Sequence, residues 1–178
     1  MISDVNAKQG GATAEQPVPL KSFGVRRAHA ADARGILACL LAAFEEYRDR
    51  YTTDAFADTV PNPQSLSERI RTMWVYVAVF DDGEIIGTLA AALTDEAHGH
   101  LRGMAVHPHF QKRGVAKQLL SVVLDDLRAN GCKQVTLDTT APLRQAMRFY
   151  EVNGFRRTGR VSDFFGMELY EYAKSLDP

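Results

Sequence analysis

The chain has 178 residues, of which 46% are hydrophobic, and its 21 Lys and Arg nearly balance its 22 Asp and Glu to leave a formal net charge of −1. This length suits a single domain with a continuous core and is too short for two full domains. The near-zero charge provides no global attraction to nucleic acid or to an anionic membrane, so neither is expected as a partner.

Residues 1–22 are rich in Gly, Ala, Gln and Pro and show no periodicity, which is typical of a mobile extension. They contain neither the basic segment nor the continuous apolar run of a secretory leader, and no run elsewhere is long enough to cross a bilayer. The expected location is therefore cytoplasmic. A single folded domain is expected over residues 23–178.

The folded segment is expected to open with a strand and two helices. Residues 23–28 (FGVRRA) are typical of a short strand. A helix is expected after Asp32, because apolar residues then recur at helical spacing. These residues are Ile36, Leu37, Leu40, Leu41 and Phe44. Residues 51–63 contain prolines and are expected to form an irregular loop at a substrate entrance, and residues 66–73 resemble a second short helix.

Three strands are expected next, the first two as a hairpin. The runs at 75–80 (VYVAVF) and 84–93 (EIIGTLAAAL) flank Asp81-Asp82-Gly83, a sequence typical of a tight turn. Residues 100–106 (HLRGMAV) form the third apolar run. Pro108 ends it, because proline cannot donate a hydrogen bond to a strand ladder.

The segment that follows has the pattern of a β-α-β unit. Residues 115–130 carry one apolar helical stripe, stop at Gly131 and lead into the strand QVTLDT at 134–139. The stripe consists of Ala116, Leu119, Leu120, Val123 and Leu127. The two strands of such a unit are parallel and its crossover is right-handed. The loop before the helix therefore lies at the carboxyl edge of the sheet, where ligands usually bind.

A last helix is expected over residues 142–153 with Gly154 after it, and residues 164–172 can supply the final strand. The expected fold is therefore a mixed α/β domain. Its order is a strand, two helices, three strands, a helix, a strand, a helix and two strands, with a parallel β-α-β unit at its centre.

The loop before the helix at 115–130 has the composition of an anion-binding site. It reads QKRGVA from Gln111 to Ala116, with two cations and with the small residues Gly114 and Ala116 where the helix begins. A helix N-terminus has unpaired N–H groups and a partial positive charge, and small residues let a phosphate approach the backbone. Taken alone, the hexapeptide is equally compatible with an ordinary turn whose cations are solvated.

Two motifs in this region resemble the Gcn5-related N-acetyltransferase superfamily. Gln111-x-x-Gly114-x-Ala116, after the strand at 100–106, resembles its acetyl-CoA signature, Q/R-x-x-G-x-G/A. The run FYEVNGF at 149–155 resembles the helix end and Gly-Phe pair of that family. The resemblance covers residues 23–172 in element order and is sharpest at 101–155. It implies an enzyme, an N-acetyltransferase that uses acetyl-CoA as cosubstrate and needs no metal.

By this resemblance acetyl-CoA lies along the loop and the strand before it. Backbone N–H groups of the loop would hold the pyrophosphate, and the end of the strand would pair with the pantetheine arm. The residues implied are Met104, Ala105, Val106, Gln111, Lys112, Arg113, Gly114, Val115, Ala116 and Lys117. Two positions depart from the family pattern. Ala116 replaces a glycine, which the pattern tolerates, and Leu143 replaces an asparagine that touches the cofactor in many members.

Acetyl transfer to an amine needs a base for the amine, donors for the oxyanion and a proton for the departing thiolate. The resemblance assigns the last role to Tyr150, whose other interpretation is a core aromatic on an apolar helix stripe. Many members carry a glutamate as base where this chain has His100, whose imidazole can accept a proton at neutral pH. Glu96 or Asp95 acting through a water is the alternative base. A backbone N–H of the strand at 100–106 would serve the oxyanion.

Other chemistries find little support in the sequence. His98 and His100 share one strand face, but no acidic or thiol partner lies at a useful spacing, so no metal site is expected. Cys39 and Cys132 lack the spacing of a redox pair or a zinc site and are expected to be buried free thiols. The glycine-rich fingerprints of dinucleotide-binding and P-loop proteins are also missing from the sequence.

The sequence leaves the acceptor open. A primary amine on a small molecule or on a protein is the expected class. Acidic and aromatic residues at 44–51 could meet a cationic amine, although a solvated helix end is the other interpretation. A homodimer is one assembly that the resemblance implies. The rival function is a non-catalytic acyl-CoA-binding regulatory module of the same fold, because phosphate capture needs only the loop, whereas turnover also needs Tyr150 and a base.

Overall fold

The computed structural model describes residues 22–176. In this range seven strands form one mixed sheet in the order β1-β2-β3-β4-β5-β7-β6. The strands are β1 (Phe23–Arg27), β2 (Trp74–Phe80), β3 (Ile85–Leu93), β4 (His98–Val106), β5 (Gln134–Thr140), β6 (Arg156–Phe164) and β7 (Met167–Ser175). Strands β4 and β5 are parallel and the other neighbours are antiparallel. The predicted extension at 1–22 lies outside the described residues, except for Ser22.

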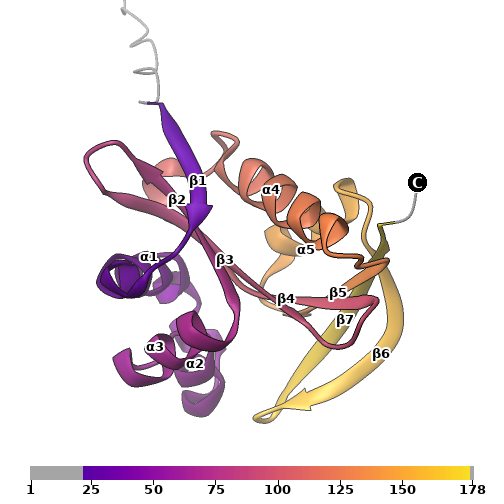
Figure 1. The fold of residues 1–178 in the computed structure, drawn as a ribbon. Helices are drawn as coiled ribbons and strands as arrows, with labels where there is room; N and C mark the ends of the chain where they lie inside the picture. The colour runs from indigo at the N-terminus through magenta and orange to yellow at the C-terminus, as the bar shows by residue number, and fades with distance from the viewer. Residues whose placement is uncertain (1–21, 177–178) are drawn as a thin grey trace, which may run out of the picture.

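Helices cover both faces of this sheet. They are α1 (Ala33–Phe44), α2 (Thr53–Thr59), α3 (Pro63–Thr72), α4 (Val115–Ala129) and α5 (Arg144–Val152), with short 3₁₀ turns at Ala30–Asp32, Glu45–Arg50 and Pro108–Phe110. Figure 1 shows α1, α2 and α3 together on one side of the sheet and α4 and α5 on the other. Each side therefore has its own hydrophobic cluster. The mixed α/β fold with a central β4-α4-β5 unit is the one that the sequence predicts.

Helix α2 corrects one prediction, because it lies in the segment expected to be an irregular loop. The Thr52 side chain caps the helix by accepting a hydrogen bond from the Ala55 N–H at 3.3 Å. Ala55 and Phe56 are its buried residues. A helix this short presents one apolar pair rather than a repeating stripe, so periodicity does not reveal it. Thr52, a residue type favoured at helix N-caps, was the sequence feature that could have indicated this helix.

The tail needs a smaller correction. The strand expected at 164–172 is in fact the end of β6, a turn and most of β7. Phe165 and Gly166 both have positive φ, at 51° and 83°, and form the turn. Phenylalanine is not a typical turn residue, so the sequence at this turn resembles that of a strand. The hairpin is therefore recognised from the backbone of the structure.

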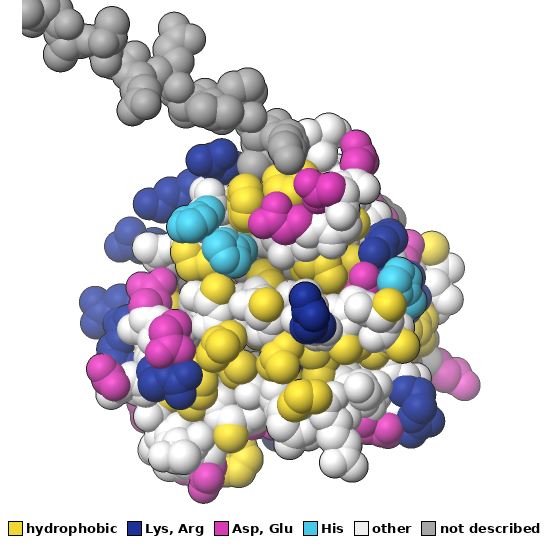
Figure 2. Space-filling view, turned by 90° about the vertical axis from the view of Figure 1, so that its left-hand side faces the viewer, with side chains coloured by type: hydrophobic (Ala, Val, Ile, Leu, Met, Phe, Trp, Pro, Cys, Tyr) yellow, Lys and Arg dark blue, Asp and Glu magenta, His cyan; other side chains and the backbone are white. Residues whose placement is uncertain are grey.

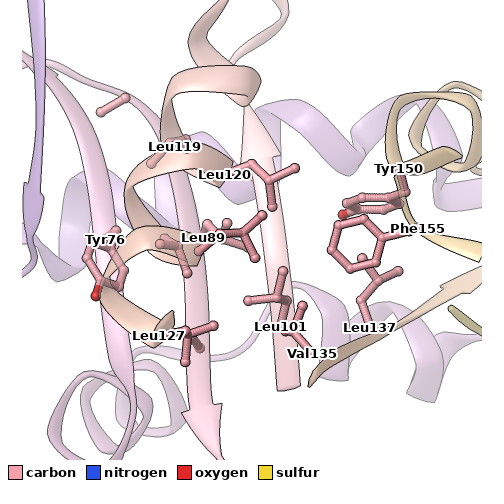
Figure 3. Close-up of a cluster of buried hydrophobic side chains, with 14 of the residues drawn as sticks. Tyr76, Leu89, Leu101, Leu119, Leu120, Leu127, Val135, Leu137, Tyr150 and Phe155 are labelled. Atoms are coloured by element: carbon pink, nitrogen blue, oxygen red, sulfur yellow. The ribbon is translucent and has the colours of Figure 1, made fainter. Parts of the chain in front are cut away.

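The larger hydrophobic cluster lies between the sheet and helices α4 and α5. The predicted apolar stripe of α4 faces the central strands, while Tyr150 and Phe155 pack beside Leu137 of β5 (Figure 3). Both cysteines, Cys39 and Cys132, are buried free thiols as predicted. This cluster fixes the position of α4 and therefore of the loop that precedes it.

Leu119 tests how much this packing stabilises the fold. The side chain is fully buried, and its Cδ1 lies so close to β3 that a Cβ added to Gly87 would come within 2.9 Å of it. We expect Leu119→Ala to lower the free energy of unfolding by about 2–5 kcal/mol in urea denaturation, because it leaves a cavity. Leu41→Ala, at a side chain 43% exposed on α1, is the matched control and should cost less than about 1 kcal/mol. Equal losses would contradict this packing.

The surface is mixed in charge. On the face drawn in Figure 2, basic and acidic side chains are interspersed around a hydrophobic middle, in keeping with the net charge of −1. Across residues 22–176, the helices are too short or too polar to cross a bilayer. In the same residues, no group of three or more His, Cys, Asp or Glu side chains is arranged to hold a metal ion.

Candidate active site

A cavity of about 750 Å³ opens where β4 and β5 separate. The two strands pair only from His98 to Leu101 and from Gln134 to Leu137. Past this point the two strand ends line the cavity, with residues 104–106 on one side and 138–140 on the other. The carboxyl edge of the parallel pair is therefore the place where a ligand can enter the sheet, as the β-α-β pattern predicts.

A β-bulge at Gly103 bends β4 at this opening. Arg102 pairs with Ala90 and Ala105 with Thr88, so β4 has one residue more than β3 between these pairs. Gly103 has a φ of +63°, in the left-handed region that residues with a side chain rarely adopt. Such a bulge redirects the strand and its backbone groups. Met104 consequently lies beyond the last β4–β5 pair and on the cavity wall.

The loop before α4 forms one end of the cavity, which we term the loop end and define as residues 110–117. Gly114 is the N-cap of α4, with a φ of +86°, and a Cβ added there would meet no atom within 4 Å. In the described residues no side chain caps this helix and its first turn has no acidic residue. The first N–H groups of a helix have no partner inside it, so they are available to an anion at this end.

Gln111 holds this loop against β4. Its side-chain Nε2 donates a hydrogen bond to the carbonyl oxygen of Val106, at 3.2 Å. The bond ties the loop to the last residue of the strand and so sets the angle at which α4 begins. The glutamine of the signature thus has a positioning role in this chain.

The residues present fit acetyl-CoA. Every residue predicted to bind it except Arg113 lines the cavity. Thr139 also lines the cavity, and within residues 22–176 its buried hydroxyl oxygen has no hydrogen-bond partner. Buried polar groups are seldom left unpaired, so a polar ligand such as the pantetheine arm would satisfy it. Leu143 occupies the cavity wall where the family pattern has asparagine, and it packs against the apolar cluster beneath α1.

Tyr150 lies at the inner wall of the cavity. Its ring is edge-on to Phe149 and Phe155, with centroid distances of 5.6 Å and 5.7 Å. The hydroxyl donates a long hydrogen bond to the sulfur of Met104, at 3.5 Å, across the gap between α5 and β4. Burial raises the pKa of Tyr150 well above its ordinary value, so the phenol keeps its proton at neutral pH. The phenol proton thus points at β4 through a long hydrogen bond to a weak sulfur acceptor.

His100 enters the cavity from the other face of the sheet. Its Nδ1 lies 2.9 Å from the Thr136 hydroxyl oxygen, and its Nε2 lies 3.6 Å from Asp138 Oδ2. Burial lowers the pKa of His100 more than Asp138 raises it, and Arg102 lowers it further. The imidazole is therefore neutral at pH 7 and can accept a proton.

The alternative bases lie elsewhere. Asp95 accepts hydrogen bonds from the backbone N–H groups of Ala97 and His98, at 2.8 Å and 2.9 Å, and so organises the turn before β4. Neither Asp95 nor Glu96 lines the cavity. The geometry therefore favours His100 among the candidates that the sequence offers.

Charged residues absent from the predicted site gather around His100. We term this the polar end of the cavity and define it as Asp58, Arg69, His100, Arg102 and Asp138, all of which line it. Asp138 had a signal in the sequence, since polar residues alternate along QVTLDT and a parallel pairing brings that face to His100. Arg69 and Asp58 come from helices, and only their docking on the sheet brings them here.

Comparison with known proteins identifies the family of this chain. The family model described as the acetyltransferase (GNAT) family matches residues 36–155. This chain belongs to the acetyltransferase (GNAT) family. The match includes β4, the loop before α4, β5 and α5, which together form the loop end and the inner wall of the cavity in this GNAT chain. The superfamily predicted from the two sequence motifs is confirmed.

Individual relatives cover less of the molecule. N-acetylaspartate synthetase of Danio rerio is 38% identical over 90 residues, which are 50% of this chain and 32% of that protein. N-alpha-acetyltransferase MAK3 of Arabidopsis thaliana is 25% identical over 96 residues, which are 51% of this chain and 50% of that protein. The GNAT chain thus spans half or less of the length of these two curated relatives.

A solved structure supports the fold along nearly the whole chain. The PaiA N-acetyltransferase from Thermoplasma acidophilum, determined in complex with coenzyme A, superposes with a TM-score of 0.72 at 17% identity. The similarity covers 86% of this chain and 99% of that one. The mixed sheet with its separated β4 and β5 is therefore the GNAT fold.

Proposed function

We propose that this chain is an acetyl-CoA-dependent N-acetyltransferase that passes the acetyl group to a primary amine by direct attack in a ternary complex. One observation carries the proposal: one cavity is lined by the N-terminus of α4, by the His100 imidazole and by the buried Tyr150 phenol. The first can hold pyrophosphate, and the other two can move the protons that amide formation requires.

The residues have distinct parts in the proposed reaction. Bound acetyl-CoA supplies the activated acyl group and its thiolate leaving group. His100 accepts a proton from the attacking amine, and Thr136 holds the imidazole ring in place. Backbone N–H groups of β4 near Met104 donate to the carbonyl oxygen as it gains charge. Tyr150 donates its proton to the departing sulfur, so that amine and thioester become amide and free thiol.

The acceptor and the assembly are part of the proposal. The names of the two relatives refer to N-acetylaspartate and to N-alpha-acetyl transfer, and an amino group is common to both kinds of acceptor. We therefore keep an amine of a small molecule or of a protein as the acceptor class. The single domain at 23–178, the cytoplasmic location and a homodimer stay predictions.

A thiol-release assay tests the proposal. The protein is mixed with acetyl-CoA and a panel of primary amines, free thiol is followed with a colorimetric reagent, and the acetylated product is identified by mass spectrometry. The proposal expects acceptor-dependent thiol release. Calorimetric binding of CoA without release for any amine would instead support the rival function, a non-catalytic acyl-CoA-binding module.

The pH dependence tests His100 as the base. Because the folded pKa of His100 is lowered below about 6.5, kcat/KM should show an acid limb below neutral pH, where the imidazole takes up a proton. Asp138 raises the pKa of His100, so Asp138→Asn should move this acid limb to lower pH. His100→Gln should remove the limb and lower kcat/KM by about 10²-fold at pH 7 with CoA affinity retained. An unchanged profile in His100→Gln would exclude His100 as the base.

A further inference from the structure

Arg69 of α3 is a half-buried cation that the proposed chemistry does not use. It lines the polar end of the cavity, and its Nη1 would lie 3.1 Å from a Cβ added to Gly103 at the β4 bulge. Within residues 22–176 its guanidinium makes one long hydrogen bond, from Nη2 to the carbonyl oxygen of Asp58 at 3.4 Å. The guanidinium therefore faces the cavity beside Gly103, which immediately precedes Met104.

The charge of Arg69 is not neutralised by an ion pair. Within residues 22–176, no Asp or Glu oxygen lies within 4.0 Å of its guanidinium. Asp58 is the acidic residue of α2 at this end, and its Oδ2 is bonded to Arg102 at 2.9 Å. The Asp58 carboxylate is therefore engaged by Arg102, and Arg69 makes no ion pair with it.

The surroundings make the unpaired charge of Arg69 costly. Burial, and then the neighbouring Arg102, lower the pKa of Arg69 to about 10, against the smaller effect of Asp58. The side chain still carries its charge at pH 7. A half-buried guanidinium without an anion is unfavourable, and a planar fork of donors suits a carboxylate better than any other common anion of small metabolites except phosphate.

We propose, on the basis of the proposed function, that Arg69 binds the carboxylate of the acceptor, and that the acceptor is a small amino acid. The reacting amine must reach the thioester near Met104, while Arg69 lies over the adjacent Gly103. Because Gly103 and Met104 are adjacent, with α-carbons about 3.8 Å apart, an acceptor whose amine and carboxylate lie close together, as in an α- or β-amino acid, suits this arrangement. The amine then faces His100 and Asp138, and the carboxylate faces Arg69.

The polar end also accommodates the rest of such a molecule. Arg102 lies close enough to both Arg69 and His100 to lower the pKa of each, so the carboxylate site and the base are neighbours. Tyr47, Tyr51 and Phe164 line the same cavity and can contact an uncharged side chain. The site thus provides an anion receptor, a base and an apolar wall within one small volume.

Matched acceptors and matched variants test this assignment. The acceptors are L-alanine, L-phenylalanine and L-aspartate, each compared with its α-carboxamide, which keeps the amine and removes the charge. The variants are Arg69→Gln and, as control, Arg71→Gln, which removes an exposed arginine paired with Glu68 on the same helix. Thiol release gives kcat/KM for each acceptor, and calorimetry gives the affinity for CoA.

The wild-type protein should prefer at least one amino acid over its amide by about 10- to 100-fold in kcat/KM, the range for hydrogen bonds to a charged group. Arg69→Gln should abolish this preference with CoA affinity and Tm unchanged, and Arg71→Gln should retain it. Equal losses for acid and amide acceptors in Arg69→Gln would show that Arg69 acts on the thioester or on stability, and would overturn the inference.

The failure of this inference differs from the failure of the proposed function. If amines without a carboxylate release thiol as fast as the amino acids do, transfer is real and the carboxylate site is wrong. If CoA binds but no acceptor releases thiol, the proposed function fails. In that case, calorimetry measures the binding of L-phenylalanine and L-aspartate to the CoA complex of the wild type and of Arg69→Gln. Binding that is lost in Arg69→Gln still supports an amino-acid site. Binding that is unaltered in the variant, or undetectable in the wild type, overturns it.

Discussion

A Gly114→Glu variant is expected to bind CoA about 10²- to 10⁴-fold more weakly than the wild type, as measured by isothermal titration calorimetry. Gly114 is the N-cap of α4, and the space beside its Cα is open to the cavity. A glutamate would bring bulk and negative charge to the place where the pyrophosphate should meet the helix N-terminus. Loss of about two hydrogen bonds to a charged group accounts for the magnitude.

The backbone of Gly114 requires a control, because a side chain at a φ of +86° is strained in any case. Gly83 in the β2–β3 turn has a φ of +88°, also has open space beside it, and does not line the cavity. Gly83→Glu should therefore lose similar stability and keep the wild-type affinity for CoA. Unchanged affinity in a folded Gly114→Glu protein would place the pyrophosphate elsewhere.

Periodicity accounts for the parts of the fold that were predicted correctly. The apolar stripe of α4 and the alternation of the strands reflect burial against one sheet, and burial on one face leaves a repeat in the sequence. Helix α2 leaves no such repeat, because it buries little more than Ala55 and Phe56. The turn at Phe165 was hidden for a related reason, since its residue type favours a strand while its backbone does not.

The candidate site divides in the same way. The residues of the loop end could be grouped from the sequence, because Gln111, Gly114 and Ala116 belong to one contiguous stretch of the chain and line the cavity together. The polar end is assembled from α2, α3, β4 and β5, so its composition depends on helix docking and strand register. Residues such as Arg69 are ordinary surface arginines in a helical pattern until the bulge at Gly103 is placed beneath them. Site residues that meet only through tertiary packing can therefore be identified from the structure and not from the sequence.

The division also has a physical meaning for specificity. In the proposed function the loop end binds the cosubstrate through backbone groups and small residues, which tolerate changes in side chains. The polar end, which we propose to select the acceptor, presents side chains from separate elements that can change independently of one another. A family with one cosubstrate and many acceptors is consistent with this arrangement.

A Tyr150→Phe variant is expected to lose about 10²- to 10⁴-fold in kcat, with little change in CoA affinity or Tm. The hydroxyl is positioned beside β4 and keeps its proton, as a general acid for the departing thiolate requires. Its bond to the Met104 sulfur is long, and sulfur is a weak acceptor, so deleting the hydroxyl should cost less than about 1 kcal/mol of stability. Rate and stability are therefore separable at this residue.

Tyr172→Phe provides the matched control for this last test. Tyr172 is 1% exposed, donates to Glu151 Oε1 at 3.2 Å and does not line the cavity. Its loss should lower stability by about 0.5–1.5 kcal/mol and leave kcat unchanged, the reverse of the result expected for Tyr150. Single-turnover measurements should establish that chemistry limits the rate. If Tyr150→Phe then turns over a good acceptor at the wild-type rate, the thiolate leaves unprotonated or takes its proton from water, and the buried phenol is only part of the core.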